Sequence, residues 1–466
     1  MSGDAEPVDD ASDTGSFSVA PGRRRALYAV MVLAILVASL IDIPRAQRAG
    51  PMTWLGLITI VESALGAAAL LAAAYLPRRV RVRVAVYGAF VAWTALSVSW
   101  APPLTQGLQN AAVYLMFGIL LTVAAVAAAE DRAAVERVIG RSMIGADVVG
   151  LGLVAASLAL RGWPTDIDHR PWLVHPRALA LFGLVPLSWH LARWTLGRER
   201  SALGASLWVA AIFVSLSRTA TAIALLLVVL AVLARKRTVK LTVPSRLLLF
   251  ALVPVAIAGV LTITPFRNRL FVRTDRSVSI NDLQLRDNGR AIMWRAVAKS
   301  ALESPILGKG LGTSESTVSD TYYWVGHPHN DYLRVWHDLG LVGLALLVTA
   351  FAIWWRILWT EWRRLARHTI SEPTLQLAAL GALAALALGM LTDNPLVYGF
   401  VMAPSAVVIG AGLGARSTFL RRRRRRRHID GTQAHDLRDD VASEEPGGLA
   451  TAPEPLPKRK RIPRRR

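Results

Sequence analysis

The sequence predicts an all-α membrane protein with about twelve transmembrane helices, and three observations lead to this prediction. Hydrophobic residues make up 53% of the 466 residues, and charged residues make up only 18%. The apolar residues gather in runs of about 18 or more, which is the length that a helix needs to cross a bilayer. Cysteine is absent, so neither a disulfide framework nor a cysteine metal site is possible.

The two ends of the chain differ from its apolar centre, residues 23–415. Residues 1–22 are acidic and small, which predicts a disordered tail, and Arg23–Arg25 before a long apolar run is typical of an uncleaved first span. Much of the formal charge of +22 lies in residues 416–466. We expect this second tail to be disordered, cytoplasmic and attracted to anionic lipids. No aromatic residue is interleaved with its arginine runs, so nucleic acid is not an expected partner.

Apolar runs follow one another along the centre of the chain, separated by polar loops. Each run is interpreted as a membrane-spanning helix because of its length and its lack of charge. The predicted spans are roughly 26–43, 53–76, 84–100, 107–128, 139–160, 177–194, 202–217, 219–234, 247–263, 335–355, 374–392 and 396–414.

Arginine and lysine are divided unequally between the loops on the two sides. One set of short loops carries clusters such as Arg78–Arg83 and Arg363–Arg367, whereas the opposite set, with "APPLTQ" and "DNP", has few cations. Cationic loops favour the cytoplasmic side. The sequence therefore predicts a multi-pass protein of the cytoplasmic membrane with both termini in the cytoplasm.

Residues 264–330 are predicted to form a large, partly helical extracytoplasmic loop before the tenth span. Apolar residues recur at helical spacing from Arg290 to Glu303, which predicts an amphipathic helix on the membrane surface, ended by Pro305 and a glycine-rich turn. That turn, "GKGLG", lacks the spacing of a phosphate loop. The loop has more basic than acidic residues, and arginine is well suited to bind phosphate oxygens.

Further polar residues stand at predicted membrane boundaries. Arg218 lies between two apolar runs with hardly any loop, and it either extends to the interface or faces a polar cavity. His327 and His329 precede the tenth span. An imidazole there can be held by loop backbone or can act as a base near neutral pH. A zinc pair is disfavoured because no fourth ligand is plausibly spaced. His337 is expected to pack or cap, with Asp338 as its polar neighbour.

Several of these residues together resemble a known family. His329-Asn330, nine residues, Gly340, two residues and Gly343 match the H-[N/S/Q]-x9-G-x2-[G/T/Y] pattern of O-antigen ligases and their polymerase relatives. The "SR" pair that ends at Arg218 and the segment "PILGKGLG" are also similar to the family. The resemblance covers roughly residues 200–400 well and the first 200 only by topology. One departure is that the R-x3-L element of the ligases ends in Trp294 here.

The resemblance implies transfer of a polyprenyl-diphosphate-linked glycan to an acceptor sugar hydroxyl at the outer face of the membrane. The transfer that the resemblance implies needs no metal and no nucleotide or other cofactor. The resemblance assigns His329 as the catalytic base and Arg218 and Arg290 as catalytic cations for the departing diphosphate. Arg286 is a substitute for Arg290 in binding substrate, and Asn330 orients the base or binds the sugar.

Two alternatives remain open at the level of sequence. A polymerase of surface polysaccharide from the same family would bring the same kind of donor to a hydroxyl. A transporter or flippase of lipid-linked glycan is a different class, which acidic residues inside the spans, such as Asp147, would suit. The sequence shows no clear internal repeat of the kind that many transporters have.

Overall fold

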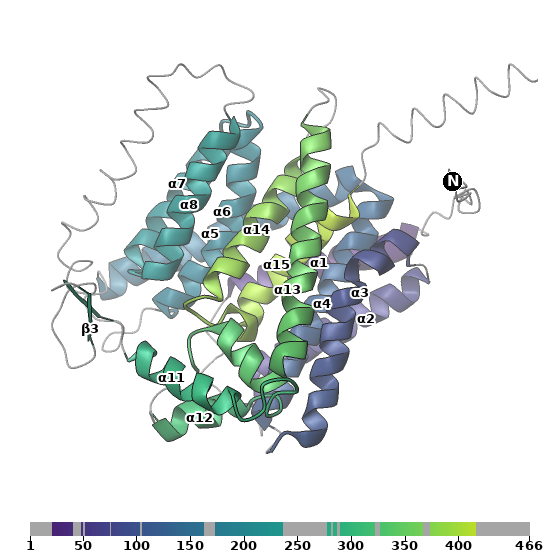
Figure 1. The fold of residues 1–466 in the computed structure, drawn as a ribbon. Coiled ribbons are helices and arrows are strands. Elements are labelled where there is room, and N and C mark those ends of the chain that lie inside the picture. The colour runs from purple at the N-terminus through teal and green to yellow at the C-terminus, as the bar shows by residue number, and fades with distance from the viewer. Residues whose placement is uncertain are drawn as a thin grey trace, which may run out of the picture. The chain divides into compact units, whose positions relative to one another are not determined.

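The computed structural model describes residues 21–40, 48–49, 52–74, 76–102, 105–162, 173–235, 277–280, 283–286, 289–321, 327–366 and 373–415. All of them belong to the first of two compact units, Met1–Arg416, and the second is Ser417–Arg466. The described part is a bundle of long helices (Figure 1). This confirms the helical class that the sequence predicts.

Every predicted span outside 247–263 coincides with a helix, and 247–263 lies outside the described residues. Within the described ranges, six helices are long and apolar enough to cross a membrane, so the number twelve stays a prediction. The helices in these positions are α1 (Pro21–Ser39), α2 (Trp54–Ala73), α3 (Arg78–Ser97), α4 (Thr105–Glu130), α5 (Arg132–Arg161), α6 (Pro176–Thr195), α7 (Ser201–Val214), α8 (Arg218–Arg235), α13 (Asp331–Leu365), α14 (Thr374–Gly389) and α15 (Gly399–Gly414).

Shorter elements lie between these helices. The large loop contains helices α11 (Arg290–Ala301) and α12 (Thr313–Thr321), and the 3-10 turns η2 (Val98–Trp100) and η3 (Pro395–Val397) follow α3 and precede α15. Two antiparallel hairpins were not predicted: β1 (Arg48–Ala49) with β2 (Met52–Thr53), and β3 (Ser277–Ile280) with β4 (Leu283–Arg286). The second has a signal in the sequence, because "SVSI" and "LQLR" alternate polar and apolar residues.

Helix α15 forms the centre of the bundle, and all of its residues are buried. It packs closely on α4 because Gly410 and Gly414, four residues apart, face the backbone carbonyls of Leu121 and Ala125. A β-carbon at either glycine would overlap those carbonyls. Small residues at this spacing let two membrane helices approach each other closely.

Helix α13 is broken at Gly340, where φ is 67° and ψ is −172°. The break separates a short segment that ends at Leu339 from the long apolar segment that begins at Leu341. A residue with a side chain rarely adopts this backbone conformation. Added bulk would also meet the carbonyl of Ile306, so both the angle and the space require glycine.

The glycine-rich turn at 305–310 supplies hydrogen bonds to the broken helix. The N–H groups of Lys309 and Gly310 donate to the carbonyls of His337 and Asp338, each at 2.9 Å. In return, the N–H of Leu341 donates to the Pro305 carbonyl at 2.8 Å. Backbone groups that the break removes from the helix are therefore paired by the turn.

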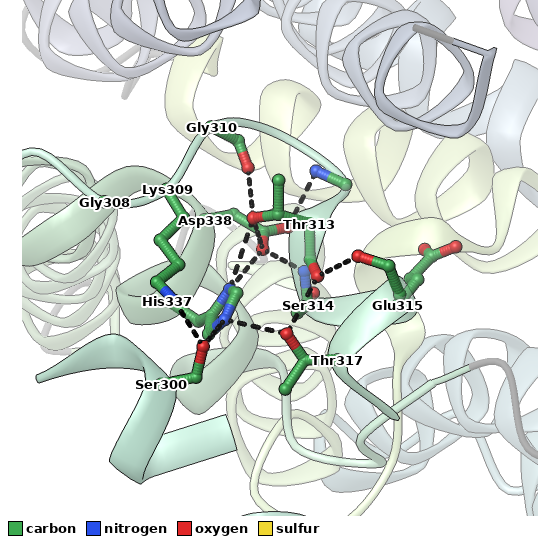
Figure 2. A network of polar contacts seen from close by, with 12 residues as sticks. Ser300, Gly308, Lys309, Gly310, Thr313, Ser314, Glu315, Thr317, His337 and Asp338 are labelled. Atoms are coloured by element: carbon green, nitrogen blue, oxygen red, sulfur yellow. Dashed lines mark hydrogen bonds and ion pairs between the residues drawn. The ribbon is translucent and has the colours of Figure 1, made fainter. Parts of the chain in front are cut away.

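His337 and Asp338 join this turn to α11 and α12 (Figure 2). The Asp338 carboxylate accepts from the N–H groups of Gly312 and Ser314 at the start of α12, at 3.0 and 2.7 Å. The buried His337 ring contacts the Ser300 hydroxyl of α11 at 3.0 Å. His337 thus packs, and its Nδ1 lies 3.0 Å from the Asp338 carboxylate, the polar neighbour that the sequence predicts.

The apolar face of α11 packs on protein. Met293 and Val297 are buried together with Val318 of α12 and against Leu333 of α13. The helix is confirmed, but the prediction that this face lies on the membrane is wrong. An apolar stripe is satisfied equally by lipid or by another apolar helix, and here α12 and α13 cover it.

We predict that Gly340→Ala disrupts folding of the membrane domain. The substitution adds strain at a positive φ and a clash with Ile306, which together should lower the free energy of unfolding by about 3 kcal/mol or more. Thermal unfolding of the purified protein, followed by size-exclusion chromatography, measures the effect. Gly88→Ala is the matched control, since a β-carbon at Gly88 of α3 meets no atom within 4 Å. Equal stability of the two variants would contradict this account of the break.

Candidate functional site

His329 stands directly before α13 in a strained conformation. Its φ is 52°, in the left-handed region that residues other than glycine seldom occupy. The next residue, Asn330, caps α13 because its side-chain oxygen accepts from the N–H of Leu333 at 3.0 Å. Holding His329 in this conformation costs on the order of 1 kcal/mol. Such strain is commonly retained at functional sites, where it directs a side chain.

The His329 ring is held by the segment that follows α14. Its Nδ1 lies 3.1 Å from the Asn394 side-chain amide and 3.6 Å from the Asp393 carboxylate. Asp393 can only accept, so it favours a proton on Nδ1. As placed, the amide nitrogen of Asn394 faces Nδ1; a proton on Nδ1 requires this amide to turn its oxygen to the ring, which would also give that otherwise unpartnered buried oxygen a donor. In the tautomer that Asp393 favours, the lone pair is on Nε2.

Asp393 also faces a cation that sequence reasoning did not single out. Arg177, the second residue of α6, lies 4.0 Å from the Asp393 carboxylate, whose side chain is only 1% exposed. Burial raises the pKa of Asp393, but the hydrogen bond with His329 and the charge of Arg177 outweigh it and hold the pKa below its ordinary value. The carboxylate is therefore ionised at neutral pH.

The same surroundings keep His329 neutral. Burial lowers the pKa of His329, and the positive charges of Arg177 and Arg290 lower it further, whereas Asp393 raises it. The net pKa is below the ordinary value for histidine. A neutral imidazole with its lone pair on Nε2 can accept a proton from a hydroxyl group.

Three arginines stand in the first turns of three helices whose ends lie near this group. Arg177 is the second residue of α6, and Arg218 and Arg290 are the first residues of α8 and α11. A helix N-terminus carries partial positive charge, so a cation placed there lowers the stability of the protein by about 0.3–1 kcal/mol. Folding alone does not favour this arrangement, but an anion would be attracted by both the helix ends and the guanidinium groups.

Helix α8 reaches the same segment through Thr219. The hydroxyl of Thr219, next to Arg218, lies 2.7 Å from the hydroxyl of Thr392, which precedes Asp393. Arg290 is close enough for its charge to lower the pKa values of His329 and Asp393. The helix ends that carry Arg177, Arg218 and Arg290 therefore all lie near residues 392–394.

Helix α11 is tied to the base by an aromatic side chain. The indole N–H of Trp294 donates to the Pro328 carbonyl at 2.7 Å, one residue before His329. Leucine at this position, as in the R-x3-L element, could pack there but could not make the bond. Trp294 therefore couples the helix that begins at Arg290 to the backbone that presents His329.

A second group of polar side chains contains His327, the other histidine that the sequence places before α13. His327 Nδ1 is 3.2 Å from the buried Glu315 carboxylate, which also accepts from Asn110 at 3.2 Å. Asp331 and the fully buried Arg334 form an ion pair at 2.7 Å. His327 thus pairs with Glu315. Among the residues that the structure describes, no cluster of three histidine or acidic side chains could hold a metal ion.

The structure brings together some of the residues that the sequence singles out. His329 and Arg290 lie at one site, and Arg218 begins the helix next to it. Arg286 ends strand β4, and its side chain lies outside the described residues. The Asn330 oxygen is used by the helix cap, so this atom already has a partner.

Sequence reasoning missed Arg177, Asn394 and Trp294 as members of the site. Arg177 follows "HP" at the start of an apolar run. Asn394 lies in "DNP", a short loop whose lack of cations bears only on the orientation of the chain. The available signal was the position of both residues at the predicted outer ends of spans, on the same side of the membrane as His329.

Comparison with known proteins agrees with this geometry. Residues 203–348 match the family described as O-antigen ligase. The matched range contains α8, α11, α12 and the broken part of α13, and so it includes Arg218, Arg290 and His329. Among curated proteins, no sequence matches the chain.

Opposite substitutions next to His329 should move its pKa in opposite directions. Asp393→Asn removes a negative charge that raises this pKa, so we expect a lower value than in the unchanged protein. Arg177→Gln removes a positive charge that lowers it, so we expect a higher value. Histidine NMR titration in nanodiscs, with His329→Gln to assign the signal, measures both. Shifts in the same direction would show that these charges do not control the ring.

Proposed function

Because residues 203–348 match the O-antigen ligase family, we propose that this membrane protein is a glycosyltransferase of surface polysaccharide synthesis. The proposed donor is a glycan linked to polyprenyl diphosphate. The proposed acceptor is a sugar hydroxyl of a glycan or glycolipid at the outer face of the cytoplasmic membrane. On this proposal the polar end of the bundle, with α11 and α12, faces outward, and both termini are cytoplasmic.

One observation carries the proposal: a neutral histidine lies within a group of helix ends that carry arginines. A diphosphate needs cations, and a hydroxyl nucleophile needs a base. His329 and the arginines of α6, α8 and α11 offer both within one site. An arrangement for transport alone would not require a base with a lowered pKa beside cations.

In the proposed reaction, Nε2 of His329 takes the proton of the acceptor hydroxyl as its oxygen attacks the anomeric carbon of the donor. The bond between that carbon and the diphosphate oxygen breaks, and the electron pair leaves with the diphosphate. Arg218 and Arg290 offset the negative charge that develops there. Asp393 stabilises the imidazolium that forms, as a carboxylate does beside a catalytic histidine. A single displacement of this kind inverts the anomeric centre.

The same chemistry serves a ligase and a polymerase, and the fate of the glycan separates the two. Deletion of the gene, followed by analysis of the lipid-linked glycans that accumulate, identifies the missing step. Long unattached chains on the lipid carrier indicate a ligase, and single repeat units indicate a polymerase. If neither accumulates and the surface polysaccharide is unchanged, the proposed function is wrong.

We predict that His329→Ala and Arg218→Lys both stop transfer without removing the protein from the membrane. Loss of a general base should lower turnover about 10²–10⁴-fold. Lysine cannot reproduce the two-pronged contact of arginine with a diphosphate, so a loss of about 10²-fold or more is expected. Product is measured with purified protein in chelator and without nucleotide. Arg235→Lys, at the other end of α8, is the matched control. Normal turnover in either site variant would remove that residue from the mechanism.

We predict that Trp294→Phe lowers kcat about fivefold while the KM for the donor changes little. Phenylalanine keeps the aromatic packing but loses the bond to Pro328, which is worth about 1 kcal/mol. Trp336→Phe is the control, because Trp336 makes the same kind of bond to the Pro305 carbonyl at 3.2 Å, away from His329. A role in stability alone would lower the melting temperature and leave kcat per folded molecule intact. That result would argue against a positioning role.

A further inference from the structure

An apolar surface is exposed at the end of α11. Leu302, Ile306 and Leu307 are 65%, 60% and 52% exposed. Ile306 and Leu307 belong to the turn that pairs with the broken helix, and Leu302 caps the end of α11, so all three are fixed on the folded bundle. Large apolar side chains gathered at one exposed turn are typical of a contact with lipid or protein.

The exposed side of α11 continues this surface and adds positive charge. Ile292, Arg295 and Lys299 are exposed and follow one another at steps of three and four residues, and Leu302 continues the same spacing. Residues at this spacing share one side of a helix. The opposite side, with Met293 and Val297, is covered by protein. Cations beside exposed apolar residues are the pattern of a helix that contacts a charged lipid surface.

The apolar turn is continuous with the lipid-facing side of α13. Leu341, Val348 and Trp355 are exposed at intervals of seven residues, so they lie on one side of this membrane helix. The N–H groups of Leu341 and Val342 donate to the carbonyls of Pro305 and Ile306, at 2.8 and 3.3 Å. Ile306 therefore lies at the same depth as the first lipid-facing residue of the long segment.

The length of the α13 segment after Gly340 places Leu341 and Ile306 at a membrane boundary. From Leu341 to Trp362 the helix rises about 32 Å at about 1.5 Å per residue, which matches a hydrocarbon thickness of about 30 Å. Glu361, Arg363 and Arg364 mark its far end, and Arg356, less than two turns before Trp362, can extend its long side chain to the same interface. Leu341, and with it the turn at Ile306, thus falls at the opposite edge of the hydrocarbon.

We propose that Ile292, Arg295, Lys299, Leu302, Ile306 and Leu307 form a docking surface for the phospholipid bilayer. Leu302, Ile306 and Leu307 enter the edge of the hydrocarbon, and Arg295 and Lys299 bind phosphate oxygens of anionic lipid headgroups. The surface holds α11, and therefore Arg290 at its first position, at the depth of lipid phosphates. The docking itself does not depend on the proposed transfer reaction.

The absence of cysteine makes a direct test possible. Single substitutions Ile306→Cys and Leu307→Cys carry a spin label in nanodiscs that contain phosphatidylglycerol. Val348→Cys is the control in lipid, and Ser316→Cys and Ser319→Cys, on exposed positions of α12, are the controls in water. We expect the labels at 306 and 307 to be relaxed by dissolved oxygen and shielded from a water-soluble nickel complex. Labels as accessible to nickel as those at 316 and 319 would overturn the proposal.

A second measurement tests the cationic half of the surface. Arg295→Gln with Lys299→Gln removes the proposed headgroup contacts and leaves the apolar turn unchanged. We expect the label at 306 to move toward water in the double variant, as it should in nanodiscs without anionic lipid. An unchanged depth in both cases would show that Arg295 and Lys299 do not bind headgroups. Neither measurement uses glycan transfer, so failure here is distinct from failure of the proposed function.

Discussion

The break in α13 at Gly340 is the constraint on which the arrangement of the site depends. A break in a long helix leaves backbone groups that would cost about 1–3 kcal/mol each if buried without partners. The turn at 305–310 pairs with them through its own backbone, so the turn and the broken helix form one structure. Asp338 and His337 then attach α12 and α11 to it. The position of α11 relative to His329 is thus fixed by the repair of a broken helix.

The electrostatic arrangement follows from that geometry and works against stability. Arg177, Arg218 and Arg290 stand at helix ends that already carry positive charge, and burial disfavours charge on His329. The negative charge of Asp393 offsets part of this unfavourable positive charge, because Asp393 faces both Arg177 and the His329 imidazole. A protein selected only for stability would place acids at these three helix ends. The excess of cations is better explained by an anion that binds among them.

The sequence predicts those parts of the structure that depend on local composition. Apolar runs coincide with helices because the length of a run is itself the requirement for a span, and the spacing of H-N-x9-G locates His329 and the break. The partner of an amphipathic face is not encoded locally, which is why the apolar face of α11 was assigned to lipid although α12 and α13 cover it. Arg177 and Asn394 were missed because their meeting with His329 depends on how α6, α13 and α14 pack.

On the proposed reaction, the arginines have a second effect besides offsetting charge on the leaving group. Arg177 and Arg290 lower the pKa of His329 while the site is empty. A bound diphosphate would neutralise part of that positive charge, and the same imidazole would then hold a proton more tightly. The base would therefore be strongest when the donor is in place and weakest when it is absent. Such coupling would activate an acceptor hydroxyl only beside a bound donor, because one set of charges governs both groups.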